Sequence, residues 1–162
     1  MRLYGQPITD RGLRAIAGLH DLQVLHVDSL DSRLDGSIRR SPNAIGDEGL
    51  LYLTTLRHLR HLSLRGCGLT EAGACYLSCL DRVETLDLSE STLADACMPY
   101  LSQMKQLTTL FLQTTHISDA AVEYFAELPN LRYLDVTGTR MSSTWYSAFP
   151  GVRIFGNERV YR

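Results

Sequence analysis

Four copies of one pattern of apolar positions recur along the chain at intervals of 24 residues. In each copy, apolar residues stand at the first, fourth, sixth and eleventh positions, and a cysteine, serine or threonine stands at the ninth. The copies begin at Leu59, Val83, Leu107 and Leu131. Alternate residues of a strand point to the same face, so Leu62-Ser63-Leu64 predicts a short strand whose two leucines face the core and whose Ser63 faces outward.

A helix is expected after each strand, because the apolar period changes there from two to about 3.6. Thr70-Glu71 and Ser118-Asp119 each place a hydroxyl at an N-cap and a carboxylate in the first turn, and Thr9-Asp10 does the same. One strand with one helix cannot bury its apolar face alone, so the units must stack. We therefore predict an α/β fold in which successive strands pair into a parallel sheet.

The small residues at the ninth position lie where the chain turns inward after each strand. They are Cys67, Ser91, Thr115 and Thr139. Buried backbone groups need hydrogen-bond partners, so we expect these side chains to bond the backbone of the neighbouring unit. This interpretation gives Cys67 a structural position in place of a redox role.

The pattern extends to about six units in a single domain over residues 1–162. The first unit begins inside a strand, and the second carries an insertion at about residues 29–41. Residues 142–162 have a weaker pattern and are expected to form a C-terminal cap. Within them, residues 150–155 resemble residues 129–134, which predicts a last strand with Phe155 at the position of Leu134.

Residues 8–13, 45–50 and 69–74 resemble the I/L-T-D-x-G-L turn of the leucine-rich repeat superfamily, in its cysteine-containing, ribonuclease-inhibitor-like and bacterial subclasses. Residues 73–78 are similar to the repeat helix of plant-pathogen effectors and F-box proteins, although Cys97, Ala121 and Trp145 replace its glycine in later units. The resemblance implies a horseshoe-shaped leucine-rich repeat solenoid with a concave parallel β-sheet and convex helices. It also implies protein recognition, as in ubiquitin-ligase substrate receptors, adaptors and assembly factors.

Charge and composition narrow the class of partner. The 16 basic and 18 acidic residues give a net charge of -2, without the basic excess expected of a protein that binds nucleic acid or an acidic membrane surface. No apolar run approaches the roughly 18 residues of a membrane-spanning helix, and the first residues do not resemble a signal peptide. The four cysteines are expected to be free thiols, which favours an intracellular location in the cytoplasm or an organelle interior.

The outward-facing strand residues are the candidate contacts for a protein partner. Phe111 and Tyr133 are expected to be solvent-facing, with Asp87 and Asp135 beside Phe111, and exposed aromatic residues flanked by charge are common interface anchors. A basic patch is expected from His61 and Arg65, with His58, Arg60 and His26 nearby. The insertion supplies a further candidate contact through Arg39 and Arg40.

Catalytic motifs are absent from the sequence: no nucleophile elbow, phosphate-binding loop or set of metal ligands occurs. We therefore predict a non-enzymatic module with neither cofactor nor metal, which binds a protein partner through the concave sheet. Two alternatives stay open. One is a structural subunit or assembly factor of a large multiprotein complex, and the other is a substrate-receptor-like part of a ubiquitin ligase.

Overall fold

The computed structural model describes residues 1–3, 8–27, 30–32, 38–40, 45–157 and 160–161. Within these residues, eight strands form one sheet in the order β1-β2-β5-β6-β7-β8-β9-β10, and β3 pairs with β4. The strands are β1 (Arg2–Leu3), β2 (Val24–Val27), β3 (Leu30–Ser32), β4 (Ile38–Arg40), β5 (His61–Ser63), β6 (Thr85–Asp87), β7 (Thr109–Phe111), β8 (Tyr133–Asp135), β9 (Arg153–Phe155) and β10 (Val160–Tyr161).

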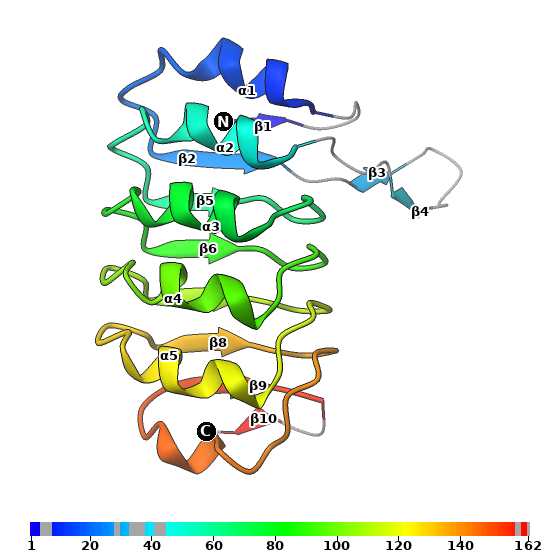
Figure 1. Cartoon of the computed structure of the whole chain (residues 1–162), viewed down its shortest axis with the longest axis vertical. Helices are drawn as coiled ribbons and strands as arrows, with labels where there is room; N and C mark the ends of the chain where they lie inside the picture. The colour runs from blue at the N-terminus through cyan, green and yellow to red at the C-terminus, as the bar shows by residue number, and fades with distance from the viewer. Residues whose placement is uncertain (4–7, 28–29, 33–37, 41–44, 158–159, 162) are drawn as a thin grey trace.

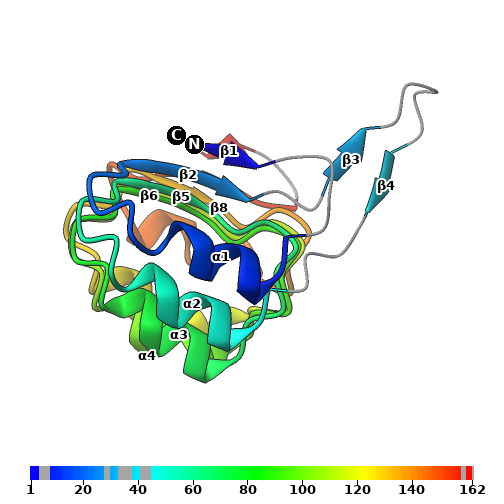
Figure 2. The ribbon, with the colours of Figure 1, turned by 90° about the horizontal axis from the view of Figure 1, so that it is seen from above.

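Helices cover one side of this sheet (Figures 1 and 2). The α-helices are α1 (Asp10–Ile16), α2 (Asp47–Leu53), α3 (Glu71–Ser78), α4 (Met98–Leu101) and α5 (Val122–Ala126). The 3-10 helices are η1 (Asp95–Cys97), η2 (Asp119–Ala121) and η3 (Tyr146–Ala148). Strands β1 to β9 of the large sheet are parallel, and β10 is antiparallel to β9. The predicted stack of strand–helix units is confirmed.

The repeated leucines form the core between the sheet and the helices. Leu62, Leu86, Leu110 and Leu134 stand opposite one another on β5 to β8, and each is 1% exposed or less. One ladder of apolar side chains therefore runs through the stack, and burial of such side chains is the main favourable term in folding.

The predicted helix starts are confirmed at all three positions: the N-caps are Thr9, Thr70 and Ser118, and Asp10, Glu71 and Asp119 stand in the first turns. The hydroxyl oxygen of Thr70 accepts a hydrogen bond from the Ala72 N–H at 3.2 Å, and that of Ser118 accepts one from the Ala120 N–H at 3.3 Å. Thr9 is the N-cap of α1, although its side chain makes no capping bond.

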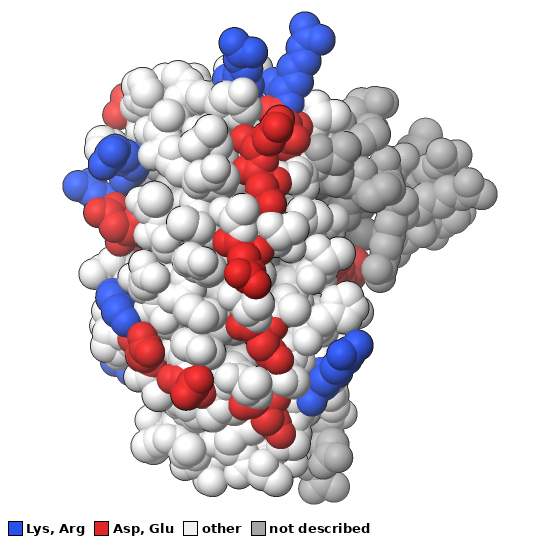
Figure 3. Space-filling view, in the orientation of Figure 1, with Lys and Arg blue, Asp and Glu red and all other residues white. Residues whose placement is uncertain are grey.

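The carboxylates that begin the helices also connect successive units. Asp10 accepts from the Gly46 N–H at 3.0 Å, Asp95 from the Ser118 N–H at 2.8 Å and hydroxyl at 2.6 Å, and Asp119 from the Ser142 N–H at 2.8 Å. Asp47 bonds Thr70 in the same way. Figure 3 shows acidic side chains in a column down this helical face. Three of these carboxylates thus accept from the N-cap residue of the next helix, which is Gly46, Thr70 or Ser118.

The small polar residues after the strands bond their own unit. Ser91, Thr115 and Thr139 donate to the carbonyl oxygens of Leu88, Leu112 and Val136, at 2.6, 2.7 and 2.7 Å. The expectation of bonds to the neighbouring unit is therefore wrong. The acceptor lies three residues back in the chain, within reach of a short side chain that folds over its own turn.

The length of a helix depends on the residue that faces the preceding helix. A Cβ atom at Gly73 would overlap the Asp47 carboxylate and lie 2.8 Å from Leu50 Cδ1, so glycine allows α3 to pack closely on α2. Cys97 and Ala121 take that place in later units, and there a 3-10 turn leads into a short α-helix.

The backbone turns through a left-handed conformation at one position of every regular unit. The φ angles are 74° at Gly66, 61° at Glu90, 55° at Thr114 and 75° at Gly138. The N–H groups of Glu90 and Thr114 donate to the next unit, to the carbonyls of Gln113 at 2.7 Å and Thr137 at 2.8 Å. The conformation therefore serves the sheet even where the side chain is not glycine.

At the end of the stack, the Asn157 side chain provides the acceptor that backbone carbonyls provide for Glu90 and Thr114. Its side-chain oxygen accepts from the Gly138 N–H at 2.5 Å, and its side-chain N–H donates to the Thr139 carbonyl at 2.9 Å. Trp145 covers the core at this end of the stack. Its ring centroid lies 5.8 Å from that of Phe125 and 4.6 Å from that of Tyr146. A side-chain amide thus stands in for the backbone of a further unit.

The insertion contains a two-stranded antiparallel sheet, in which Leu30 pairs with Arg40 and Ser32 with Ile38. Strands β3 and β4 lie away from the stack of units (Figures 1 and 2). Strands β2 and β5, which flank the insertion in the sequence, still pair directly, with Leu25 opposite Leu62.

Candidate functional site

Strand register brings the predicted contact residues into two columns on the sheet face opposite the helices. One column contains Val24, His61, Thr85, Thr109, Tyr133 and Arg153, and the other contains His26, Ser63, Asp87, Phe111, Asp135 and Phe155. Phe111 and Tyr133 therefore lie on neighbouring strands, as the sequence predicts.

Three aromatic rings form a continuous row on this face, which we call the aromatic row. The ring centroids of Phe111 and Tyr133 lie 5.3 Å apart with a tilt of 53°, and those of Tyr133 and Phe155 lie 5.0 Å apart with a tilt of 30°. All three rings are half-buried, because each covers its neighbour. The expectation that Phe111 faces solvent freely is thus only partly met.

Phe155 and Arg153 belong to this site, and sequence reasoning missed both. Phe155 pairs with Asp135, and Ile154 stands at the core position opposite Leu134. The predicted alignment of Phe155 with Leu134 is wrong by one residue, and a slip of one residue moves a side chain to the opposite face of a sheet. The guanidinium carbon of Arg153 lies 5.1 Å from the Phe155 ring centroid, within the range of a cation–π contact.

The two aspartates beside Phe111 differ in exposure. Asp135 is 5% exposed and accepts hydrogen bonds from the Gln113 side-chain amide at 2.6 Å and the Thr137 N–H at 3.0 Å. Asp135 and Ser63 lie on the outward face, as the sequence predicts, but they are buried there, and Ser63 is 4% exposed. A short side chain beside larger neighbours on flanking strands is covered by them. Asp87 is half-buried, and one of its oxygens accepts from the Ser89 N–H at 2.9 Å.

The Tyr133 phenol lies in the field of two charged neighbours. Burial is the largest cause that raises its pKa above the usual 10.0, and the Asp135 carboxylate acts in the same direction. Arg153 acts in the opposite direction without cancelling the rise. The phenol therefore stays protonated at neutral pH and can donate a hydrogen bond.

The predicted basic patch is largely neutralised by carboxylates. Arg65 Nη2 lies 2.7 Å from Glu90 Oε1, Arg60 pairs with Glu84, and His58 Nδ1 lies 3.5 Å from Asp21 Oδ1. His26 and His61 are half-buried on the sheet face nearby. Arg39 and Arg40 lie on β4, and their side chains are outside the described part of the structure.

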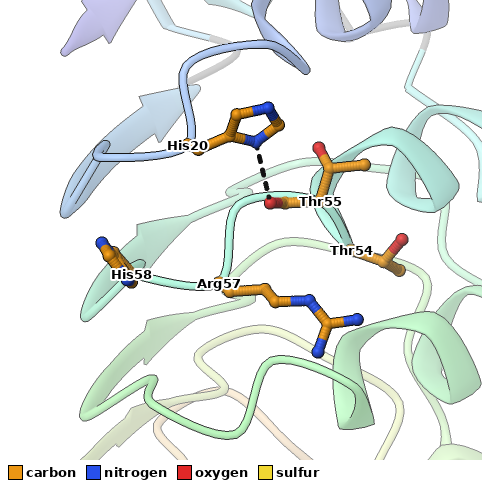
Figure 4. A pocket seen from close by; sticks show the side chains of 5 residues that line it. All are labelled: His20, Thr54, Thr55, Arg57 and His58. Atoms are coloured by element: carbon orange, nitrogen blue, oxygen red, sulfur yellow. Dashed lines mark hydrogen bonds between the residues drawn. The ribbon is translucent and has the colours of Figure 1, made fainter.

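A hollow of about 430 Å³ lies at the loops that lead from α1 to β2 and from α2 to β5. It is lined by His20, Thr54, Thr55, Arg57 and His58 (Figure 4). His20 Nδ1 bonds the Thr55 carbonyl at 3.4 Å, and the Thr54 and Thr55 hydroxyls donate to backbone carbonyls. The hollow adjoins the C-terminal end of α2, where the helix dipole favours cations. The hydroxyls of Thr54 and Thr55 thus cap the last carbonyls of this helix.

Other kinds of site find no support in the described residues. No group of three or more His, Cys, Asp or Glu side chains there is arranged to hold a metal ion. None of the helices in that part of the chain has the length and apolar character needed to cross a bilayer.

Comparison with known proteins gives one sequence match and several structural ones. Residues 55–78 match the family described as Leucine Rich repeat. No curated protein matches the chain in sequence. Two internalins from Listeria monocytogenes str. 4b F2365 share the fold. Internalin C2 has a TM-score of 0.65 and 22% identity over 89% of this chain and 55% of its own. Internalin F has a TM-score of 0.67 and 17% identity over 90% of this chain and 37% of its own.

The plant peptide hormone receptor RGFR1, solved in complex with RGF2, has a TM-score of 0.55 and 20% identity over 88% of this chain and 21% of its own. This chain spans about half the length of internalin C2 and less of the other two proteins. At these identities the likeness establishes the fold.

Proposed function

Because the chain is a leucine-rich repeat protein, we propose that it is a non-enzymatic recognition module that binds a protein partner through the concave face of its sheet. The fold is typical of protein interaction modules. The observation that carries the proposal is the aromatic row, because three half-buried rings at outward positions cover no core. Aromatic side chains and arginine are the residue types most enriched among interface hot spots.

Substitution of two rings tests the proposal. We expect the double variant Phe111→Ser with Tyr133→Ser to recover at least about tenfold less partner in affinity purification than the parent chain, because hot-spot rings contribute 2 kcal/mol or more. Leu51→Ser is the matched control, since Leu51 is 49% exposed on a helix and its loss also removes exposed apolar surface. Circular dichroism checks that both variants fold. Equal partner recovery by the double variant and the parent would refute the proposal.

A second function, a permanent subunit of a larger assembly, is favoured by the apolar side chains at the first unit. Leu19 lies just after α1. Its backbone makes the same hydrogen bonds that Leu56, Leu80 and Met104 make after their own helices. It is 47% exposed, whereas those three are 3% exposed or less. Sedimentation of the isolated chain separates the two functions: a stable monomer supports the recognition module, and obligate association supports the subunit.

A further inference from the structure

The aromatic row lies between two opposite charges on the concave face. At one end, Asp87 stands opposite Phe111 in the strand register. At the other end, Arg153 stands opposite Tyr133, and its guanidinium lies over the Phe155 ring. Among the described residues, neither Asp87 nor Arg153 forms an ion pair. The surface therefore presents an anion on β6, one ring each on β7 and β8, and a cation lying over the third ring on β9.

The spacing of these charges suits an extended chain. Three strand-to-strand steps separate β6 from β9, and Arg153 stands two residues before Phe155 on its strand. Strands about 4.8 Å apart with a rise of about 3.3 Å per residue put the two Cα atoms about 16 Å apart. Four residues of an extended chain span about 13 Å, and the long arginine side chain reaches across the remainder. A helix would need about eleven residues to cover the same span.

We propose, on the basis of the recognition function above, that the aromatic row selects an extended peptide segment with a basic, an apolar and an acidic side chain at alternate positions. Alternate side chains of an extended chain point to one face, so the three residues stand at i, i+2 and i+4. The basic side chain pairs with Asp87, the apolar one lies on Phe111 and Tyr133, and the acidic one pairs with Arg153. The Arg153–Phe155 contact holds the guanidinium in place before the peptide arrives, which lowers the entropy cost of binding.

Four synthetic peptides test the proposal against isotope-labelled protein by NMR titration. The matching probe is Gly-Lys-Ser-Leu-Ser-Glu-Gly. The charge controls carry two glutamates or two lysines at the charged positions, and the apolar control carries serine in place of leucine. We expect the matching probe to bind about three- to fivefold tighter than each charge control, as exposed ion pairs of up to about 1 kcal/mol imply. The shifts are expected at the amides of Phe111, Tyr133 and Phe155.

Reversal of one charge on the protein tests which charged residue of the peptide pairs with Asp87 and which with Arg153. Arg153→Glu is expected to favour the two-lysine peptide, and Asp87→Lys the two-glutamate peptide. Arg140→Glu, at an exposed arginine outside the strands, should leave the order of affinities unchanged. The proposal is overturned if the four peptides bind equally, or if none causes saturable shifts at the row.

Two further outcomes would also overturn it. One is self-association through the row, seen as concentration-dependent shifts without peptide, and the other is tighter binding of a helical peptide with its charges about eleven residues apart. If partner recovery depends on Phe111 and Tyr133 but not on the charges of Asp87 and Arg153, the proposed function stands and this inference fails.

Discussion

Thr114 adopts a backbone conformation that suits glycine, and the chain itself provides the comparison, because Gly66 and Gly138 occupy the same position in other units. A β-branched residue at positive φ carries a steric cost of about 1–2 kcal/mol. The threonine side chain is exposed, and its backbone N–H bond to Thr137 does not depend on the side chain. Within the residues that the structure describes, nothing therefore compensates for the strain.

We expect Thr114→Gly to raise the free energy of unfolding by about 0.5–1 kcal/mol, because relief of strain exceeds the added entropy of the unfolded chain. Urea denaturation measures this change. Thr137→Gly is the control: Thr137 is also exposed but has no positive φ, so its replacement should lower stability by about 0.5–1 kcal/mol. Destabilisation by both substitutions would show that residue 114 is not strained.

Burial of the Cys97 thiol makes the stability of the folded chain depend on pH. Burial is the largest cause that raises the pKa of its thiol above 9.0, and the carboxylates of Glu71 and Asp47 add to the rise, while a hydrogen bond to Ala94 opposes it. A raised pKa in the folded state means that the native protein holds the proton more tightly than the unfolded chain. The contribution to stability is therefore complete below pH 9 and is lost as the pH rises through the folded pKa.

Between about pH 8 and pH 10, we expect the unfolding free energy of the parent chain to fall more steeply than that of Cys97→Ala. Denaturation curves at several pH values measure the two slopes. Cys75→Ala removes an exposed thiol and should reproduce the slope of the parent chain. Identical slopes for all three proteins would mean that the Cys97 thiol titrates alike in the folded and unfolded states.

At the scale of helices and strands, the aspartates that begin the helices connect one unit to the next. Asp95→Ala removes acceptors from both the N–H and the hydroxyl of Ser118, so we expect a loss of about 1–2 kcal/mol in urea denaturation. Glu71 occupies the same repeat position, but no hydrogen bond joins it to the next unit in the described structure. Glu71→Ala should therefore change stability by less than about 0.5 kcal/mol. Equal losses would point to the helix dipole in place of the bond between units.

The parallel strands of the repeat units, the helix starts and the two concave columns follow from the sequence because each rests on a local period, whereas β3, β4 and β10 do not. The bond from Asp95 to Ser118 does not, because a carboxylate in a first turn is already explained by its own helix. The position of Phe155 does not follow from the sequence, because its strand ends a shortened unit and its register depends on hydrogen bonds to β8 that no local pattern encodes. Burial of Asp135 depends likewise on neighbours from other strands.

At the scale of the whole molecule, a solenoid contacts only neighbouring units, so stability at its ends depends on local caps. We expect Asn157→Ala to lower the unfolding free energy by about 1 kcal/mol. Hydrogen exchange should accelerate at the Gly138 amide, which loses its acceptor, and stay unchanged at Glu90 and Thr114, whose acceptors are backbone carbonyls. Uniform acceleration at all three amides would indicate global destabilisation and would contradict a local cap.

The direct pairing of β2 with β5 has a consequence for how such a chain can evolve. The insertion adds a hairpin between β2 and α2, yet Leu25 still stands opposite Leu62. A change of loop length at this edge of the sheet is therefore absorbed outside the hydrogen-bonded ladder. Descendants of one ancestral repeat can gain or lose such loops without any compensating change in their leucines, so new surface can be acquired while the scaffold is inherited intact.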